Sequence, residues 1–419
     1  MKKIITISDH PLSASGVGTQ TKYFIEALLK TGEYEVFSLA GAIKHGDYSI
    51  IVPEEWQGKW KIMPVDGYGT QDLIRDLLHH EKPDCMWIMT DPRFYQWLWD
   101  ISDEVRSVCP LVYYHVWDNY PYPIFNKNSY DSNDRIVTIS KLTQDIVQTI
   151  SPDTKPIYLP HAVNQSFFNV KQEEKTSQIR KAIFKNTPDR DGKFTVFFNS
   201  RNARRKQSGS LIFWFKEFLD IVGHENANLL MHTDVKDPHG QDLEAIIRHL
   251  GITNGEVIFS TSKLPAETLS LMYNMCDCTI APSDAEGFGL SMLESMACGT
   301  PIICTMTGGM QDQITDGQNW FGIGLEPASR AIIGSQQIPW IYEDRVSGED
   351  VVNALLKMYN MSEEERLSMS KLAVENVNNR FSFKLYEERW VKFMNEVISD
   401  SGSWDNRKNY ARWDLKEIL

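Results

Sequence analysis

Residues 281–305 read APSDAEGFGLSMLESMACGTPIICT, and this stretch decides the fold of its half of the chain. A strand pattern ends at Pro282, and the loop that follows carries Asp284 and Glu286. The run GFG at 287–289 permits close backbone approach before a helix starts, and the apolar run PIICT closes the stretch. A strand, a helix and a second strand in this order predict parallel strands with the helix packed on the sheet.

The same alternation runs in both directions from this stretch. In the C-terminal half, the strand-like runs FTVFFNS, NLLMHT, EVIFS, DCTIAP and PIICT are separated by helical patterns. In the N-terminal half, KIITIS, YEVFSLA, CMWIMT, LVYYHVW and RIVTIS are spaced in the same way. Between the two series, residues 165–192 are polar and charged and end in turn-forming residues. The pattern predicts an α/β fold with parallel sheets covered by helices on both faces.

We therefore expect two Rossmann-like, doubly wound domains that face each other across a cleft. Ligands of this architecture bind outside the carboxyl ends of the strands. The expected bounds are an N-terminal domain over residues 1–170, a linker over 171–192, a C-terminal domain over 193–385, and C-terminal helices over 386–419 that pack back on the N-terminal domain.

The composition of the chain argues against several classes of function. The chain of 419 residues has a formal net charge of −13, which argues against a broad grip on duplex nucleic acid or anionic lipid, because both need a positive field. No apolar run reaches the roughly 18 residues that span a bilayer, and MKKIITIS reads as neither signal nor anchor. The six cysteines lack the spacing of a zinc site or a disulfide framework, so we expect a cytoplasmic protein without a metal site.

Two features of the C-terminal half suit a diphosphate. The helix that follows residue 289 presents free N–H groups and the positive end of its dipole. The segment FFNSRNARRKQSG places Arg201, Arg204, Arg205 and Lys206 just beyond a strand end, where their cations can make short charge-assisted bonds to phosphate oxygens. A solvated basic turn is the alternative interpretation of this segment.

Two glutamates flank the start of the same helix. Glu286 lies in the loop and Glu294 stands eight positions later, about one turn into the helix. Both carboxylates can accept hydrogen bonds from the hydroxyls of a sugar or a ribose. The alternative interpretation is an ordinary amphipathic helix with two surface glutamates.

The N-terminal half carries weaker signals. SDHPLSASGVGTQTKYF places Gly16 and Gly18 between the first strand and the first helix, but Thr21 stands where a dinucleotide fingerprint needs a third glycine. Taken alone, this pair is as much a structural turn as a ligand loop. His115 ends the strand pattern LVYYHVW, so we expect its ring to open into the cleft, although a single histidine is more often packed or surface-exposed.

The run EGFGLSMLESMACGTP at 286–301 resembles the E-x7-E signature of glycosyltransferase family 4, whose members are retaining enzymes of the GT-B fold. The segment around Arg201 and Lys206 is similar to a second element of that family, but Gln207 and Ser208 depart from it and leave Arg205 as a competitor for the role of Lys206. The resemblance covers the C-terminal half fully and the N-terminal half loosely. It implies that the C-terminal domain binds the nucleotide sugar and that the N-terminal domain is on the acceptor side.

The resemblance implies a role for each of these positions. Glu286 would hold the donor sugar, Glu294 the ribose and His115 the sugar from across the cleft, while Arg201 and Lys206 would offset the charge of the leaving diphosphate. The residues expected to act in catalysis are Glu286, His115, Arg201 and Lys206. Those expected to bind the donor are Gly16, Gly18, Arg205, Lys263, Leu264, Gly287, Phe288, Gly289, Leu290 and Glu294.

The implied function is metal-independent transfer of a sugar from a nucleoside diphosphate sugar to a hydroxyl acceptor, with no cofactor. The acceptor stays open between a glycan, a lipid-linked molecule, a small molecule and a modified nucleic-acid base, the last of which the acidic net charge disfavours. The oligomeric state is also open. The alternatives are a nucleotide-sugar epimerase or phosphorylase of the same fold, or a non-catalytic protein that binds nucleotide sugars.

Overall fold

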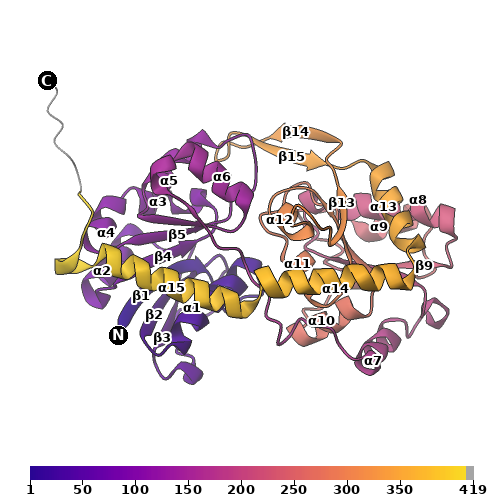
Figure 1. Cartoon of the computed structure of the whole chain (residues 1–419), viewed down its shortest axis with the longest axis horizontal. Coiled ribbons are helices and arrows are strands. Elements are labelled where there is room, and N and C mark those ends of the chain that lie inside the picture. The colour runs from indigo at the N-terminus through magenta and orange to yellow at the C-terminus, as the bar shows by residue number, and fades with distance from the viewer. Residues whose placement is uncertain (412–419) are drawn as a thin grey trace. The chain divides into compact units, whose positions relative to one another are not determined.

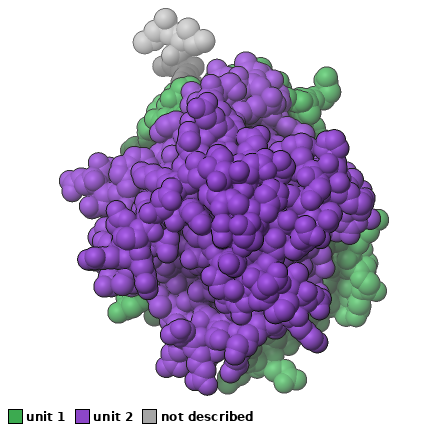
Figure 2. All heavy atoms as spheres, turned by 90° about the vertical axis from the view of Figure 1, so that its right-hand side faces the viewer, with its two compact units in different colours: residues 1–161, 334–341, 384–419 green, residues 162–333, 342–383 purple. Residues whose placement is uncertain are grey.

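The apolar runs form the strands of two parallel sheets, as the computed structural model, which describes residues 1–411, shows in Figure 1. The chain divides into two units, coloured green and purple in Figure 2. Unit 1 comprises residues 1–161, 334–341 and 384–419, and unit 2 comprises residues 162–333 and 342–383. Residues 412–419, the end of the expected C-terminal helices, lie outside the described part.

Unit 1 is built on a seven-stranded sheet in the order β3-β2-β1-β4-β5-β6-β7. All its strand pairs are parallel, and Ile4 of β1 pairs with Val36 of β2 and with Cys85 of β4. The strands are β1 (Lys2–Asp9), β2 (Tyr34–Gly41), β3 (Trp60–Pro64), β4 (Cys85–Met89), β5 (Leu111–His115), β6 (Arg135–Thr138) and β7 (Ile157–Tyr158). The helices are α1 (Gly16–Lys30), α2 (Gln71–Glu81), α3 (Gln96–Trp99), α4 (Ser102–Val108), α5 (Lys127–Asp131), α6 (Lys141–Ile150) and α15 (Phe383–Ser401).

Unit 2 is built on a six-stranded sheet in the order β10-β9-β8-β11-β12-β13. Its paired strands are also parallel. The strands are β8 (Phe194–Asn199), β9 (Ala227–His232), β10 (Val257–Ser260), β11 (Cys278–Ala281), β12 (Ile302–Thr305) and β13 (Gly322–Leu325). The helices are α7 (Glu173–Ile183), α8 (Ser208–Val222), α9 (Leu243–Leu250), α10 (Ala266–Asn274), α11 (Leu290–Ala297), α12 (Met310–Ile314), α13 (Gly348–Asn360) and α14 (Glu363–Arg380).

Both sheets reverse their strand order at one point, between β1 and β4 in unit 1 and between β8 and β11 in unit 2. The strands of these centres are almost wholly buried, which explains why they read as continuous apolar runs. Side-chain oxygens cap several helix starts: Ser15 accepts from the N–H of Gly18 at 2.9 Å, and Ser140 accepts from that of Thr143 at 3.0 Å. These caps fix where each strand-to-helix loop ends.

The segment expected as a linker contains a helix of unit 2. α7 spans Glu173–Ile183, and its Arg180 donates to Asp191 at 2.6 Å, to the carbonyl of Met275 at 2.7 Å and to that of Lys193 at 3.0 Å. These bonds hold residues 171–192 to the sheet of unit 2, although their polar composition suggests a free connection.

The last helix of the described chain completes the core of unit 1. α15 runs alongside α1 in Figure 1 and buries Trp390 completely. The ring of Trp390 lies 4.8 Å from that of Phe24 on α1 and 4.9 Å from that of Tyr114 on β5. Arg407 then donates to Asp134 at 2.6 Å.

A two-stranded hairpin, β14 (Ser329–Ile333) and β15 (Ile341–Arg345), leaves the sheet of unit 2. Its strands belong to unit 2 apart from Ile341, whereas its loop, residues 334–341, belongs to unit 1. Ile338 and Ile341 pack against the hydrophobic core of unit 1, and Trp340 lies edge-on to Phe125 at 5.0 Å.

Candidate donor site

The candidate site of unit 2 lies where its sheet reverses direction. The basic loop follows β8, the loop with Glu286 follows the adjacent β11, and residues 306–309 follow β12, the next strand. Parallel strands carry all three loops to the same edge. Three segments that are far apart in the sequence therefore contribute to one site.

Lys206 and Arg205 both bind Glu286. The Lys206 ammonium forms an ion pair with Oε2 of Glu286, and Nη1 of Arg205 donates to the same oxygen at 2.9 Å. Lys206 is buried, whereas the side chain of Arg205 is 47% exposed. Burial raises the pKa of Glu286, but the two cations outweigh that effect and hold it below the ordinary value. Glu286 is therefore ionised at neutral pH.

The other two arginines of the basic loop have carboxylate partners of their own. Arg201 forms a two-pronged pair with Asp237, at 2.6 and 3.0 Å, and also contacts His239 at 2.8 Å. Arg204 pairs with the buried Glu343 of β15. Arg201 is thus held away from Glu286, and the structure brings together Lys206, Arg205 and Glu286.

The glycine-rich loop is shaped by close backbone contacts. Gly289 adopts a φ of +87° at the start of α11, in the left-handed region that favours glycine. A Cβ on Gly289 would lie 2.7 Å from Cγ of Met310. A Cβ on Gly309 would lie 2.6 Å from the carbonyl oxygen of Gly287. Phe288 is buried and its carbonyl accepts a hydrogen bond from Gln313. The loop 287–290 and the Gly309 loop therefore form one tight unit.

Glu294 lies at the end of a short polar chain. The hydroxyl of Tyr273 donates to Oε2 of Glu294 at 2.8 Å, and Asn199, the last residue of β8, donates to the Tyr273 hydroxyl at 2.7 Å. Burial raises the pKa of Glu294 to about 7, and the bond from Tyr273 opposes that shift in part. Tyr273 fixes the orientation of this carboxyl group.

Asp284 adds a second carboxyl with a raised pKa. Burial raises its pKa to about 6, against the hydrogen bond that Gln207 donates at 2.7 Å. Its backbone N–H donates to the carbonyl of Arg205 at 2.8 Å, and its carbonyl accepts from the N–H of Asp344 at 2.9 Å. Asp284 thus ties the basic loop to the loop of Glu286 and to β15.

Sequence reasoning did not identify Tyr273, Asn199 or Gly309 as site residues. Tyr273 looks like one more apolar position on a helix, and no local motif marks Asn199. Only the GG pair at 308–309, directly after a strand, was a usable signal. Lys263 and Leu264 lie in the loop after β10, with the Lys263 side chain exposed.

Gly16 and Gly18 open α1 in unit 1, directly after β1. Gly18 is buried, and a Cβ there would lie 2.7 Å from the carbonyl oxygen of His10 and 2.5 Å from Oγ of Ser13. Gly16 is exposed. The turn therefore requires glycine at position 18 for packing, whereas Gly16 lies on the surface of the loop.

His115 does not open toward solvent as the sequence suggests. Its ring is fully buried between Tyr113 and Tyr130, and its Nε2 lies 2.8 Å from the Tyr130 hydroxyl. Burial lowers the pKa of His115 to about 3, so the imidazole is neutral. The cause is α5, which carries Tyr130 over the end of β5, a contact that no local pattern predicts.

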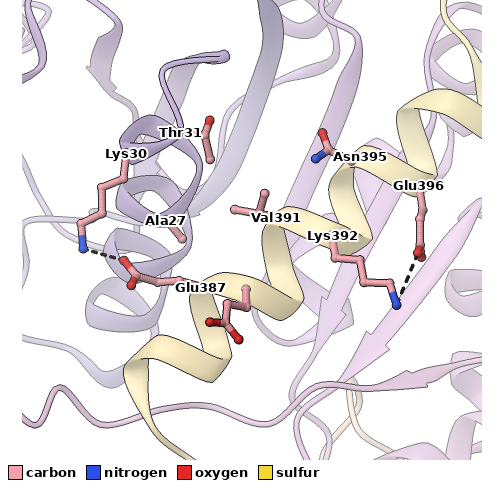
Figure 3. A pocket seen from close by; sticks show the side chains of 9 residues that line it. Ala27, Lys30, Thr31, Glu387, Val391, Lys392, Asn395 and Glu396 are labelled. Carbon is pink, nitrogen blue, oxygen red and sulfur yellow. Dashed lines mark hydrogen bonds and ion pairs between the residues drawn. The ribbon is translucent and has the colours of Figure 1, made fainter.

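Two other features of the described residues bear on function. Across residues 1–411, no cluster of three or more His, Cys, Asp or Glu side chains has the arrangement of a metal site, and no helix has the length and apolar character to cross a membrane. A groove of about 650 Å³ lies in unit 1 between α1 and α15, with Lys30 paired to Glu387 at 2.5 Å (Figure 3). None of the residues named above as the candidate site lines this groove.

The family model matches the C-terminal half of the chain and not the N-terminal half. Residues 179–334 match the family model described as glycosyl transferases group 1. This range contains Arg201, Lys206, Glu286 and the other candidate residues of unit 2, but neither the glycine pair nor His115. Residues 179–334 are thus similar to group 1 glycosyl transferases.

The curated relatives match over different lengths: an uncharacterized glycosyltransferase from Methanocaldococcus jannaschii is 28% identical over 255 residues, which is 58% of this chain and 59% of that protein. A D-inositol 3-phosphate glycosyltransferase from Acidothermus cellulolyticus is 36% identical over 108 residues, which is 25% of this chain and 24% of that protein. The aligned stretches span from 21% to 32% of the length of the first curated relatives.

Solved structures match over nearly the whole chain. Sucrose-phosphate synthase from Thermosynechococcus elongatus has a TM-score of 0.74 at 15% identity, covering 95% of this chain and 100% of that one. Anabaena HepE in complex with UDP and glucose has a TM-score of 0.68 at 13% identity, covering 94% and 100%. The two parallel-sheet α/β units therefore form a GT-B fold, as the sequence predicts.

Proposed function

We propose that this protein is a retaining, metal-independent glycosyltransferase that moves a sugar from a nucleoside diphosphate sugar to a hydroxyl acceptor. The observation that carries the proposal is the convergence of Lys206 and Arg205 on Glu286, beside the glycine loop, within the stretch that matches group 1 glycosyl transferases. The structural neighbour solved with UDP and glucose supports a nucleotide-sugar donor, with UDP as the first nucleotide to test.

The cations and the helix start would receive the donor diphosphate. Lys206, Arg205 and the first N–H groups of α11 are positive groups at one sheet edge, and they would stabilise the charge that develops as the diphosphate leaves. Lys206 is the main candidate for this role because it is buried, so its charge is poorly screened. Arg201 would act only after leaving Asp237.

Glu286 must exchange partners when the donor binds. Its Oε2 is bound to both cations, so a diphosphate that takes Lys206 and Arg205 would release the carboxylate. The released, ionised carboxylate could then accept hydrogen bonds from hydroxyls of the transferred sugar. Glu294, held by Tyr273, would accept from the ribose. The acceptor proton would pass to a donor phosphate oxygen on the same face, so no protein base is assigned.

The test is release of free nucleoside diphosphate from UDP-, GDP- and ADP-sugars. We expect the native protein to turn over one donor. Lys206→Ala should reduce kcat by about a hundredfold or more, the scale of losing one preorganised charge-stabilising group. Glu286→Ala should do the same. Lys216→Ala, which removes a half-buried lysine of α8 paired with Asp220, is the matched control and should keep native turnover.

The retaining outcome is tested on the same reaction by NMR of the product anomer. Inversion of the anomeric centre would overturn that part of the proposal. Tight nucleotide binding without turnover of any donor or acceptor would overturn the transferase proposal as a whole. Native turnover in excess chelator is expected for a metal-independent enzyme.

A further inference from the structure

A small cavity of unit 1 lies at the carboxyl ends of β4 and β5, apart from the candidate donor site of unit 2. It has a volume of about 90 Å³ and is lined by Asp91, Val116, Trp117, Asp118, Asn119, Ile338 and Ile341. The carboxyl edge of a doubly wound sheet is where ligands bind. None of the residues assigned above to the donor lines this cavity.

The lining combines apolar walls with carboxylates. Trp117 is almost fully buried and donates its Nε1–H to the carbonyl of Asn119 at 2.8 Å, so its ring is fixed. Ile338 and Ile341 form the opposing apolar surface. Asp91 and Asp118 supply carboxylates, and burial raises the pKa of Asp91. An aromatic ring and carboxylates together suit a sugar ring, which has apolar C–H faces and hydroxyl edges.

The negative charge of the lining favours uncharged acceptors over phosphorylated ones. The described residues that line the cavity include no lysine or arginine. Asp91 pairs with Arg93, whose Nε lies 3.5 Å from the carboxylate and whose guanidinium covers the ring of Phe94 at 4.8 Å. A phosphate group placed here would meet two carboxylates at short range, which disfavours it. An uncharged sugar meets no such cost.

The hairpin supplies one wall of the cavity and is anchored at its base. Within unit 2, Asp344 of β15 donates its N–H to the carbonyl of Asp284 at 2.9 Å and accepts from the hydroxyl of Thr307 at 2.8 Å. Within unit 1, Ile338 at the loop lines the cavity, and Ser335 closes the turn by donating its N–H to the carbonyl of Ile338 at 2.7 Å. The turn of the loop is thus closed within unit 1, and the strand that follows it is bonded within unit 2.

We propose that this cavity is the acceptor subsite for an unphosphorylated sugar, and that the hairpin loop 334–341 is a specificity element of that subsite. The inference rests on the proposed function and names the acceptor class. At about 90 Å³, the space of roughly three liquid water molecules, the cavity takes one edge of a sugar ring with its hydroxyls. The remainder of the acceptor would extend outward.

The test compares paired acceptors with the donor that the native protein turns over. Glucose is paired with glucose 6-phosphate, and mannose with mannose 6-phosphate. We expect diphosphate release to accelerate with an unphosphorylated member only. Asp91→Asn should raise the acceptor KM by about tenfold or more, the scale of losing a hydrogen bond to a charged group. Donor hydrolysis without acceptor should stay within about twofold of native, because Asp91 lies outside the donor site.

Two further variants make the test sharp. Ile338→Trp should fill the cavity and abolish acceptor-stimulated release while leaving donor hydrolysis intact. Asp72→Asn, the same charge change at a carboxylate whose side chain is 93% exposed, is the matched control. An unchanged acceptor KM in both cavity variants, or preference for the phosphorylated member of each pair, overturns the inference.

A binding measurement separates this inference from the proposed function. Saturation-transfer NMR with glucose needs no donor, and we expect a signal with the native protein that Ile338→Trp loses. Absence of the signal with the native protein overturns the cavity as a sugar site even if the donor is hydrolysed. Absence of donor turnover together with a signal that depends on Ile338 overturns only the transferase.

Discussion

The protonation of the Glu294 carboxyl group makes the free energy of unfolding depend on pH. Its pKa in the folded state is about 7, above the ordinary value of 4.5, and burial is the main cause. Between these two values the folded state binds more protons than the unfolded state. Its contribution to stability is therefore present below about pH 4.5 and is lost as pH rises through 7.

We predict that Glu294→Gln raises the melting temperature at pH 8 relative to the native protein, and that this gain shrinks at pH 5. An amide keeps an acceptor for the Tyr273 hydroxyl and removes the ionisation that burial disfavours. Thermal unfolding at both pH values measures the difference. Glu267→Gln on α10, at an exposed position, is the control. An equal gain at both pH values would contradict the assignment.

At the residue scale, the sequence predicts contacts between site residues where both residues belong to recognisable motifs. Glu286, Arg205 and Lys206 come together because each follows a central strand, and the order of strands could be read from the sequence. The Asn199–Tyr273–Glu294 chain joins β8, α10 and α11, and only the packed structure brings those elements together. The burial of His115 could not be predicted for the same reason, because Tyr130 covers its ring from α5.

The element that sets the shape of the donor loop is the start of α11. Gly289 has a φ of +87°, and its missing side chain leaves room for Met310 of α12. A non-glycine residue in this conformation costs about 1–2 kcal/mol before any clash. The loop therefore depends on glycine both for its dihedral angle and for its contact with α12.

We predict that Gly289→Ala lowers the free energy of unfolding by about 2 kcal/mol and raises the KM for the donor. Gly317→Ala is the matched control, because Gly317 has a φ of +94° but nothing within 4 Å of its Cβ position. Urea unfolding of both variants separates backbone strain from the clash. Equal destabilisation, with the donor KM unchanged, would show that the contact with Met310 carries no weight.

Most elements of the two sheets could be predicted because their strands are buried on both faces and read as apolar runs. The hairpin β14–β15 was not predicted. Its strands are short and mostly exposed or half-buried, so they carry no clear alternation, and its position depends on the contacts of Glu343 and Asp344 as well as on the packing of Ile338 and Ile341. The sequence of α7 predicts a linker because it is polar and charged, and the structure shows that none of its residues is buried.

At the scale of the whole molecule, each unit has its own hydrophobic core, and α15 completes that of unit 1. Trp390 is fully buried against Phe24 and Tyr114. Truncating such a side chain leaves a cavity and costs about 3–5 kcal/mol. The loss belongs to unit 1, because every ring named here is part of it.

We predict that Trp390→Ala reduces hydrogen-exchange protection in β1 and β4 and leaves β8 and β11 at native protection. Mass spectrometry of the exchanged peptides measures both sheets in one experiment. Trp320→Ala, at a position 51% exposed in unit 2, is the control and should change neither sheet. Loss of protection in both sheets with Trp390→Ala would show that the units do not unfold independently.

Because the ribosome makes the chain from its N-terminus, α15 is synthesised long after the sheet that it covers. The seven strands of the first sheet are complete at Tyr158, but the helix that covers Phe24 and Trp87 begins only at Phe383. During the interval in which the whole of unit 2 is synthesised, those two stacked rings have no permanent cover. Nascent chains of this protein should therefore expose an aromatic surface that chaperones recognise and that promotes aggregation until α15 has been made.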